Sequence, residues 1–258
     1  MRKIYEEILE EFKKCALKAG DILIREYKKN NLKYKEKMER DYVSEVDFKV
    51  EEEVKKILSK KFKNIPFIGE EMGGDYVEEM FICDPLDGTR NFIQKLPFFS
   101  FSIAYVKKSE PFVGLIYIPL LNELFYAIKN EGAYLNGKRI QVSRKKKGFI
   151  IGTGFPFRRR EYWDLYYRKF KEVFENSDDL RRPGSASQDL AYVACGRYDG
   201  FFEFGLLPWD IFAGVLIVEE AGGKTSDMEG ERNHLKTGNI IAGNMYAYNL
   251  LLKIFKGK

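Results

Sequence analysis

The most informative segment of this chain reads Phe81-Ile82-Cys83-Asp84-Pro85-Leu86-Asp87-Gly88-Thr89. An apolar run leads directly into Asp-Pro-x-Asp-Gly-Thr, and because proline cannot donate to a strand ladder, we expect the chain to turn at Pro85. Asp84 and Asp87 are then three residues apart on a tight turn, where their carboxylates can converge. Gly88 and Thr89 can open a helix whose N–H groups favour an anion. Asp, Pro and Gly are also ordinary turn residues, so the segment alone supports a simple turn equally well.

Three further acidic segments stand at the ends of predicted elements. Glu70 follows an apolar run, Asp210 lies at the start of an apolar helix, and Asp47 lies at the start of another; the segments are Gly69-Glu70-Glu71, Pro208-Trp209-Asp210 and Ser44-Glu45-Val46-Asp47. Each has a purely structural explanation: a solvated loop, a favourable charge at a helix N-terminus, and an acidic capping box. Together the four segments favour a different interpretation. Oxygen-only ligands suit hard cations such as Mg²⁺, and a cation relieves the repulsion between clustered carboxylates.

Length and composition exclude several classes of protein. The chain has 258 residues, 45% of them apolar and 32% charged, which predicts one large or two modest globular domains. Three scattered cysteines (Cys15, Cys83, Cys195) fit neither a disulfide framework nor zinc spacing, and the single histidine, His234, argues against a catalytic triad. The longest apolar run, 97–106, is too short for a bilayer, and the charged N-terminus lacks a signal-peptide stretch, so we expect a cytoplasmic protein without membrane association.

The charge balance permits an anionic substrate without demanding nucleic acid. The chain carries 44 basic and 39 acidic residues, a net charge of +5. Two basic runs stand out, Arg144-Lys145-Lys146-Lys147 and Arg158-Arg159-Arg160. Because no aromatic stacking motif accompanies them, a solvated loop or helix end is favoured over an RNA contact. Nucleic acid is therefore not an expected partner.

Periodicity divides the chain into two halves. Helices are predicted over 4–23 and from Ser44 to 58, with a polar, Lys-rich stretch over 28–40 between them. Strands follow at 65–68, 80–83, 99–106, 112–118 and 123–128, and Asn136-Gly137 predicts a hairpin. Beyond the basic stretch 141–148 the pattern alternates, with strands at 149–153, 200–204 and 239–242 and helices at 162–174, 188–195, 209–221 and 246–255. We therefore predict two domains: residues 1–146 as an N-terminal α+β metal-binding domain, and residues 147–258 as an α/β domain that completes the active site.

Taken together, these motifs resemble those of the inositol monophosphatase family, within the wider superfamily of lithium-sensitive, Mg-dependent sugar phosphatases. The resemblance covers nearly the whole chain and rests on Gly69-Glu70-Glu71, Asp84-Pro85-Leu86-Asp87-Gly88-Thr89, Gly132-Ala133-Tyr134-Leu135-Asn136-Gly137, Gly184-Ser185-Ala186 with Asp189-Leu190-Ala191, and Trp209-Asp210-Ile211-Phe212-Ala213-Gly214 running on to Glu220-Ala221-Gly222-Gly223. Cys83 and Phe212 depart from the family's usual residues, and Phe212 is expected to alter the packing behind the site. The resemblance implies a layered α-β-α-β-α fold, with an antiparallel sheet in the N-terminal half and alternating α/β in the C-terminal half.

The resemblance also implies a catalytic centre with two or three Mg²⁺ ions. The first ion would be held by Glu70, Asp84 and the Leu86 carbonyl, the second by Asp84, Asp87 and Asp210, and a weaker third by Glu70 through water. Thr89, aided by Asp47, would orient and deprotonate the attacking water. The N–H groups of Gly88 and Thr89 would hold phosphate oxygens.

The implied reaction is hydrolysis of a phosphate monoester of inositol or a sugar, such as inositol 1-phosphate. By the family's positions, Asp87, Ala186 and Glu203 would contact the alcohol. Arg181 and Arg182 lie either on a surface loop or against a second phosphate, as in fructose 1,6-bisphosphate. Nucleotide 3'-phosphatase activity and a non-catalytic role with RNA polymerase remain alternatives. A homodimer is expected, with apolar surface between Phe98 and Phe125 and around residues 155–157.

Overall fold

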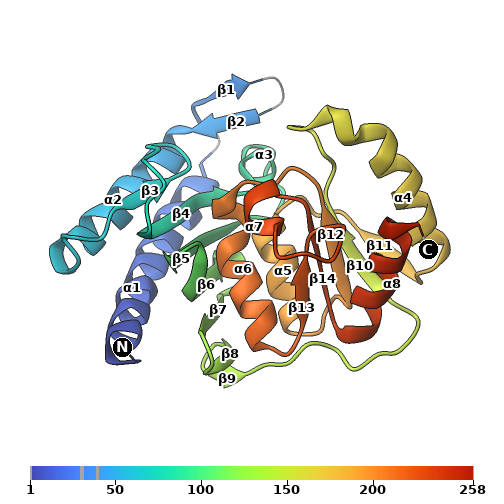
Figure 1. The fold of residues 1–258 in the computed structure, drawn as a ribbon. Helices are drawn as coiled ribbons and strands as arrows, with labels where there is room; N and C mark the ends of the chain where they lie inside the picture. The colour runs from blue at the N-terminus through green and yellow to red at the C-terminus, as the bar shows by residue number, and fades with distance from the viewer. Residues whose placement is uncertain (1, 30–31, 39–40, 258) are drawn as a thin grey trace.

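The computed structural model of the chain describes residues 2–29, 32–38 and 41–257. Five layers alternate between helices and sheets across the molecule (Figure 1), which confirms the predicted α-β-α-β-α architecture. Within the described residues, none of the helices combines the length and the apolar character needed to cross a bilayer.

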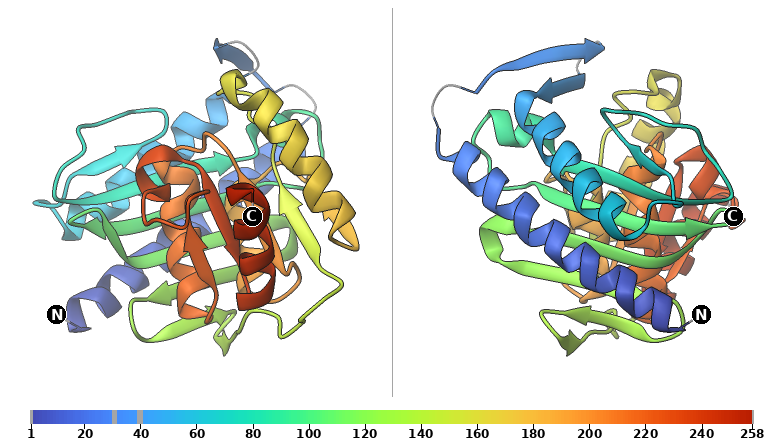
Figure 2. Two further views of the ribbon diagram at one scale, coloured as in Figure 1. Left: turned by 45° about the vertical axis from the view of Figure 1, so that its right-hand side comes forward. Right: turned by 90° about the vertical axis from the view of Figure 1, so that its left-hand side faces the viewer.

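The first sheet has seven strands and carries two long helices on its outer face. In spatial order the strands are β3 (Phe67–Gly69), β4 (Glu79–Asp87), β5 (Ser100–Lys107), β6 (Glu110–Ile118), β7 (Glu123–Ile128), β8 (Gly132–Leu135) and β9 (Lys138–Arg139). All neighbours pair antiparallel except β3 and β4, which are parallel. Helices α1 (Arg2–Tyr27) and α2 (Glu45–Lys61) lie side by side across this sheet (Figure 2, right). The antiparallel N-terminal sheet is thus confirmed, with one parallel edge.

The second sheet is mixed and has five strands. Its order is β11 (Asp179–Arg181), β10 (Ile150–Thr153), β12 (Gly200–Glu203), β14 (Ile240–Gly243) and β13 (Lys224–Ser226). Strand β10 is parallel to both neighbours, whereas β14 is antiparallel to both. Helices α4 (Trp163–Glu175) and α8 (Met245–Lys256) lie on its outer side (Figure 1), and α7 (His234–Thr237) is a short connector. Strands and helices alternate along this half, as predicted.

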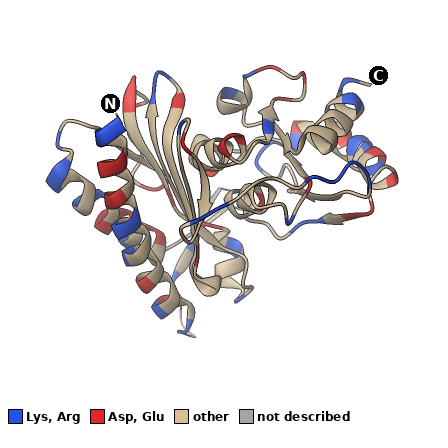
Figure 3. Ribbon diagram, turned by 90° about the horizontal axis from the view of Figure 1, so that it is seen from below, with Lys and Arg blue, Asp and Glu red and all other residues tan. Residues whose placement is uncertain are grey.

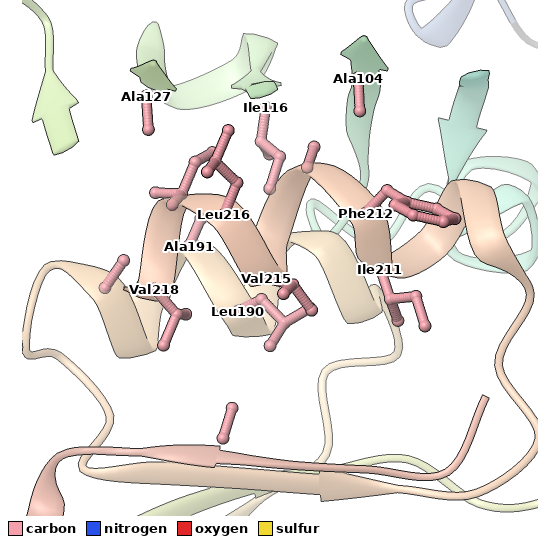
Figure 4. Close-up of a cluster of buried hydrophobic side chains, with 14 of the residues drawn as sticks. Ala104, Ile116, Ala127, Leu190, Ala191, Ile211, Phe212, Val215, Leu216 and Val218 are labelled. Atoms are coloured by element: carbon pink, nitrogen blue, oxygen red, sulfur yellow. The ribbon is translucent and has the colours of Figure 1, made fainter. Parts of the chain in front are cut away.

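Two helices, α5 (Ala186–Ala194) and α6 (Pro208–Glu220), fill the space between the sheets. Helix α6 is apolar on every side, as expected of a helix with no face toward water, and residues 210–218 are all buried. Figure 4 shows Phe212 and Leu216 directed toward strands that carry Ala104 and Ile116, with Val215 on the opposite side of α6 near Leu190 of α5. Phe212 therefore packs between α6 and the first sheet.

Three apolar clusters match the four interfaces of the layered structure. One joins α1 and α2 to the first sheet, one surrounds α5 and α6 and reaches both sheets, and one joins the second sheet to α4 and α8. The division into domains 1–146 and 147–258 stays a prediction. What the structure gives is the position of the change of sheet, between β9 and β10.

Most predicted elements are confirmed with shifts of a few residues, but the Lys-rich stretch is not simply a connection. Strand β1 (Tyr34–Met38) pairs antiparallel with β2 (Asp41–Ser44) in a separate two-stranded ribbon; residues 30–31 and 39–40 of the stretch lie outside the described part of the chain. Lys and Glu alternate in the middle of β1, so hydrophobic periodicity gives no sign of the ribbon. Strands β11 and β13, three residues each, were also not predicted.

The predicted turn at Pro85 is wrong. Strand β4 continues to Asp87, and its pairing with β5 shifts there: Asp84 is opposite Ser102, while Asp87 is opposite Ser100. Between these two pairs β4 has two residues, Pro85 and Leu86, whereas β5 has one, Phe101. This is a β-bulge with one extra residue in β4. Proline cannot donate to the ladder, and the bulge lets the strand continue past Pro85.

Candidate active site

The bulge in β4 brings two carboxylates to one place. Side chains alternate between the faces of a regular strand, so residues three apart point to opposite faces. The extra residue between Asp84 and Asp87 cancels that alternation. One oxygen each of Asp84, Asp87 and Asp210 lie within 4.8 Å of one another, the last coming from the first turn of α6.

Each of the three carboxylates is held by donors that leave part of it available. Asp84 Oδ1 accepts from the Leu86 N–H at 2.9 Å, and Asp210 Oδ2 accepts from the Leu207 N–H at 2.7 Å. Asp87 Oδ2 accepts from the second half of the chain, namely Ser185 Oγ (2.8 Å), Ser187 N (2.7 Å) and Ser187 Oγ (2.6 Å). Asp87 therefore connects β4 to the start of α5.

Burial and mutual repulsion make this cluster costly to ionise. Burial raises the pKa of Asp84 well above its ordinary value, and the Glu70 and Asp87 carboxylates raise it further. Burial also raises the pKa of Asp87, against hydrogen bonds from Ser187 and Ser185 that lower it. Burial raises the pKa of Asp210 to about 7, although Arg158 opposes that rise. A cation at this point would remove the penalty.

Glu70 lies beside this cluster on the loop that follows β3. Its N–H donates to the Cys83 carbonyl at 3.1 Å, which ties the loop to β4. The buried Glu51 of α2 fixes the next residues, since its carboxylate accepts from the N–H groups of Glu71 (2.9 Å) and Met72 (2.8 Å). The two acidic residues of the Gly-Glu-Glu motif thus differ in placement, and Glu70 is the one that borders the pocket.

Thr89 and Asp47 meet across the gap between α3 (Thr89–Ile93) and α2. Thr89 Oγ1 lies 3.2 Å from Asp47 Oδ1 and 3.0 Å from the Leu86 carbonyl oxygen, so its single proton can go to either acceptor. Asp47 Oδ2 accepts from the Ser44 N–H (2.9 Å) and Ser44 Oγ (2.5 Å), which forms the predicted capping box of α2. Asp47 is therefore both a helix cap and a partner of Thr89.

Gly88, just before Thr89, must be glycine. Its φ is +90°, and a Cβ there would lie 2.7 Å from the Phe98 carbonyl oxygen. A side chain at this position would be strained and would clash with backbone. The left-handed residue ends β4 and starts α3, which aims Thr89 at Asp47.

These side chains line the floor of a pocket of about 630 Å³. Of the residues predicted from the sequence, the pocket is lined by Glu70, Asp84, Leu86, Asp87, Gly88, Thr89, Arg182, Ala186, Glu203 and Asp210. Asp47 reaches it through Thr89. Arg181 does not line it: its side chain pairs with Asp179 at 2.5 Å.

Glu203 and Arg182 come from the second half of the chain and also line the pocket. Glu203 ends β12 and packs against Gly154, where a Cβ would lie 2.1 Å from its carboxylate. Burial raises the pKa of Glu203 to about 8, with Asp210 adding to the rise and Arg182 opposing it. The Arg182 guanidinium lies over the Phe155 ring, 4.9 Å from its centroid.

The pocket also contains basic residues that the sequence does not assign to it. Arg158 was placed in a solvated run, but its side chain is only 17% exposed and lies 3.6 Å from Asp210 and 3.8 Å from Glu70. Other lining residues that were not predicted to belong to the site include Tyr42, Arg90, Phe155, Phe157, Arg160 and Trp163. A usable signal exists for the loop after β10. Gly154 and Pro156 interrupt the pattern directly after a predicted strand, where loops carry functional residues.

The donor set fits a hard divalent cation. The clustered group contains carboxylates alone, from residues 84, 87 and 210, and Leu86, which lies between the first two in the bulge, also lines the pocket. Mg²⁺ prefers such oxygen ligands and usually keeps water or substrate phosphate in its remaining positions. The pocket above the carboxylates provides room for that phosphate.

Comparison with known proteins gives a consistent result. The sequence model of the inositol monophosphatase family matches residues 4–257. Nus factor SuhB of Escherichia coli K12 is 43% identical over 237 residues, which cover 90% of this chain and 89% of that protein. The fructose-1,6-bisphosphatase/inositol-1-monophosphatase of Aquifex aeolicus is 41% identical over 260 residues, with 97% and 96% coverage. Among solved structures, extragenic suppressor protein suhB from Bartonella henselae has a TM-score of 0.92 at 38% identity, covering 97% of this chain and 98% of that one.

Proposed function

The chain belongs to the inositol monophosphatase family, and from that premise we propose that it hydrolyses a phosphate monoester of inositol or a sugar with Mg²⁺ as cofactor. The observation that carries the proposal is the group of three carboxylates within 4.8 Å, set on the floor of a pocket beside a hydroxyl–carboxylate pair. A purely structural cluster would gain nothing from burying three like charges together. A phosphatase needs them to hold cations against its substrate.

The residues of the chain divide into ligands and proton carriers. Glu70, Asp84 and the Leu86 carbonyl would hold one ion, and Asp84, Asp87 and Asp210 a second. When bound, the ions supply Lewis acidity, which polarises the phosphoryl group and makes water more acidic.

The proton carriers are Thr89 and Asp47. Thr89 Oγ1 takes the proton of the attacking water as it passes its own to Asp47 Oδ1, 3.2 Å away. This transfer requires the Thr89 hydroxyl to point at Asp47 rather than at the Leu86 carbonyl.

The rest of the pocket would bind the two ends of the substrate. The N–H groups of Gly88 and Thr89 hold phosphate oxygens, and Asp87, Ala186 and Glu203 contact the alcohol. Burial raises the pKa of Glu203 to about 8 in the metal-free chain, which favours the protonated carboxyl near neutral pH, and that form can donate to a hydroxyl oxygen as well as accept from one.

A bisphosphate is the second candidate substrate, and Arg182 supports it. The Arg182 and Arg160 side chains line the pocket, and arginine suits phosphate geometry. A relative from Aquifex aeolicus is named for both fructose-1,6-bisphosphatase and inositol-1-monophosphatase activity. Aromatic residues Phe155 and Trp163 also line the pocket, so a nucleotide 3'-phosphate belongs in any substrate panel.

The direct test is a substrate panel with a disabled control. The purified chain is assayed for phosphate release, by kcat/KM, from inositol 1-phosphate, fructose 1,6-bisphosphate and a nucleotide 3'-phosphate, with and without Mg²⁺. Asp84→Asn should abolish turnover, whereas Asp21→Asn, a matched change at an exposed position on α1, should not. Turnover of every ester by Asp84→Asn at the wild-type rate would exclude the proposed centre.

A non-catalytic role remains the alternative from a different class. Several relatives are named Nus factor SuhB, and the run 144–147 is exposed on the connection between the sheets. Acidic and basic residues are mixed along α1 (Figure 3), which argues against a broad nucleic-acid-binding surface there. Salt-dependent RNA binding that survives Asp84→Asn, together with no phosphatase activity, would favour this alternative.

We also propose a homodimer, and the exposed apolar side chains indicate where two copies would meet. Among the described residues, the exposed large apolar side chains between residues 98 and 125 are Phe98 and Leu121, and Phe155 is exposed in the segment 155–157. Larger exposed apolar side chains lie on α4, at Trp163, Tyr167 and Phe174. This aromatic face is the better candidate for a contact with a second copy.

A further inference from the structure

Arg158 lies inside the carboxylate cluster rather than on the surface. Its guanidinium is 3.6 Å from Asp210 Oδ2 and 3.8 Å from Glu70 Oε1, carboxylates whose side chains are only 4% and 8% exposed. Asp210 belongs to the proposed second metal site and Glu70 to the first. Arg158 therefore puts one positive charge between one carboxylate of each proposed ion site.

The neighbouring arginines have other partners, so proximity in sequence does not explain this position. Arg159 pairs with the exposed Glu161, and Arg160 lines the pocket. The Arg158 guanidinium also lies over the Phe157 ring, 4.8 Å from its centroid. An aromatic face on one side and carboxylates on the other give the guanidinium a defined site.

The contacts are loose enough to be replaced. Charge-assisted N–H···O bonds are usually about 2.7–2.9 Å long, and both contacts to Arg158 exceed that range. A divalent ion brings twice the charge to about 2.0–2.1 Å from each oxygen. Direct coordination should therefore displace the guanidinium from Asp210.

We propose that Arg158 is the resident cation of the carboxylate cluster, which neutralises Glu70 and Asp210 before metal binds and competes with the metal for them. The inference rests on the proposed metal-dependent function. It adds a free-energy cost to metal binding, because the guanidinium must leave the carboxylates before the ion can bind them. Once displaced, the guanidinium remains at the wall of the same pocket, where an incoming phosphate offers it a new anionic partner. Metal binding and phosphate binding then assist one another through a single side chain.

The experiment measures metal binding rather than turnover. The full-length chain is stripped of metal, and binding of Mn²⁺ is followed by the EPR signal of the free ion, with and without inorganic phosphate. Arg158→Gln should tighten the weakest Mn²⁺ site about tenfold, or about 1.4 kcal/mol. Arg158→Lys, which keeps the charge, should stay nearer the wild type. Arg159→Gln makes the same change in net charge beside Glu161 and should leave the affinity unchanged.

Phosphate provides the second half of the test. It should tighten Mn²⁺ binding in the wild type by a larger factor than in Arg158→Gln. Only the wild type has a guanidinium that can move from the carboxylates to the phosphate. An affinity in Arg158→Gln equal to or weaker than wild type would overturn the inference and leave the proposed function standing, since Arg158 would then be a structural tie. Failure of the wild type to bind Mn²⁺ at all would overturn the proposed function and this inference with it.

Discussion

Asp47 has two roles in the structure that substitutions can separate. Its Oδ1 is the partner of Thr89 at 3.2 Å, and its Oδ2 closes the cap of α2 with Ser44. Asp47→Asn and Thr89→Ala should each lower kcat by about 10²–10⁴-fold, because general-base assistance contributes about that much. The double variant should lose little more than either single one, because residues that act as a unit are not additive.

The capping role alone has a different signature, and Ser44 supplies the control. Loss of a helix N-cap costs about 1 kcal/mol, which in a chain of this size lowers Tm by about 2–4 °C. Ser44→Ala removes the hydroxyl that donates to Asp47 and accepts from the Val46 N–H, but it leaves the contact between Asp47 and Thr89. We expect Ser44→Ala to match the Tm loss of Asp47→Asn with kcat nearly unchanged.

Three measurements on the four variants decide the question. These are kcat from phosphate release at saturating substrate, Tm by circular dichroism, and a Mg²⁺ titration of the rate. Thr89→Ala should keep the wild-type Mg²⁺ dependence, since its hydroxyl is a proton carrier and not a ligand. Additive losses in the double variant, or an Asp47→Asn variant that behaves like Ser44→Ala in both kcat and Tm, would refute the pairing of Thr89 with Asp47.

Four other outcomes are expected. EDTA should abolish phosphate release and Mg²⁺ restore it, with millimolar Li⁺ inhibiting; full turnover in metal-free buffer would exclude the metal centre. Arg182→Ala should raise KM for fructose 1,6-bisphosphate about tenfold or more and spare inositol 1-phosphate, since a charged hydrogen bond contributes about 1.5–3 kcal/mol, whereas Arg181→Ala, whose partner is Asp179, should affect neither; equal losses on both esters would indicate a structural role for Arg182. Burial raises the pKa of Glu203 from 4.5 to about 8, so the folded metal-free chain retains a proton that the unfolded chain releases, and Tm should fall as pH rises through this window; Glu203→Gln should flatten that slope, and an unchanged slope would show that Glu203 is ionised in the fold. Sedimentation should give the mass of two chains, and Tyr167→Glu on α4 should give the mass of one if the aromatic face is the contact.

Local patterns in the sequence were sufficient to predict most helices and strands and the acidic residues that line the pocket, whereas the five-layer arrangement was implied by the family resemblance. Buried helices and strands have apolar periods that a single sequence displays, and the carboxylates stand at element ends where loops begin. The bulge at Pro85 could not be predicted from the sequence. A proline after an apolar strand indicates a turn or a bulge equally, and only the pairing of Asp84 with Ser102 and Asp87 with Ser100 distinguishes them.

The position of Arg158 could not be predicted for a similar reason. It lies on the loop after β10, and Glu203 ends β12, which runs parallel to β10. Parallel neighbours bring their C-terminal ends to one edge of a sheet, so the loop and Glu203 meet there. Nothing local in Arg158-Arg159-Arg160 separates the first arginine from the other two. The ribbon of β1 and β2 is not predicted because the Lys- and Glu-rich sequence of β1 has no apolar period.

Helix α6 has a consequence for how the protein loses its structure. Its residues 210–218 are buried between the two sheets. Neither sheet can therefore separate from α6 without exposing apolar side chains of the helix. Chemical denaturation should therefore proceed in one cooperative transition, although the chain contains two sheets. Asp210 stands at the first turn of the same helix. An ion bound there would add its binding free energy to the entire transition, and the denaturation midpoint would rise with the concentration of the ion.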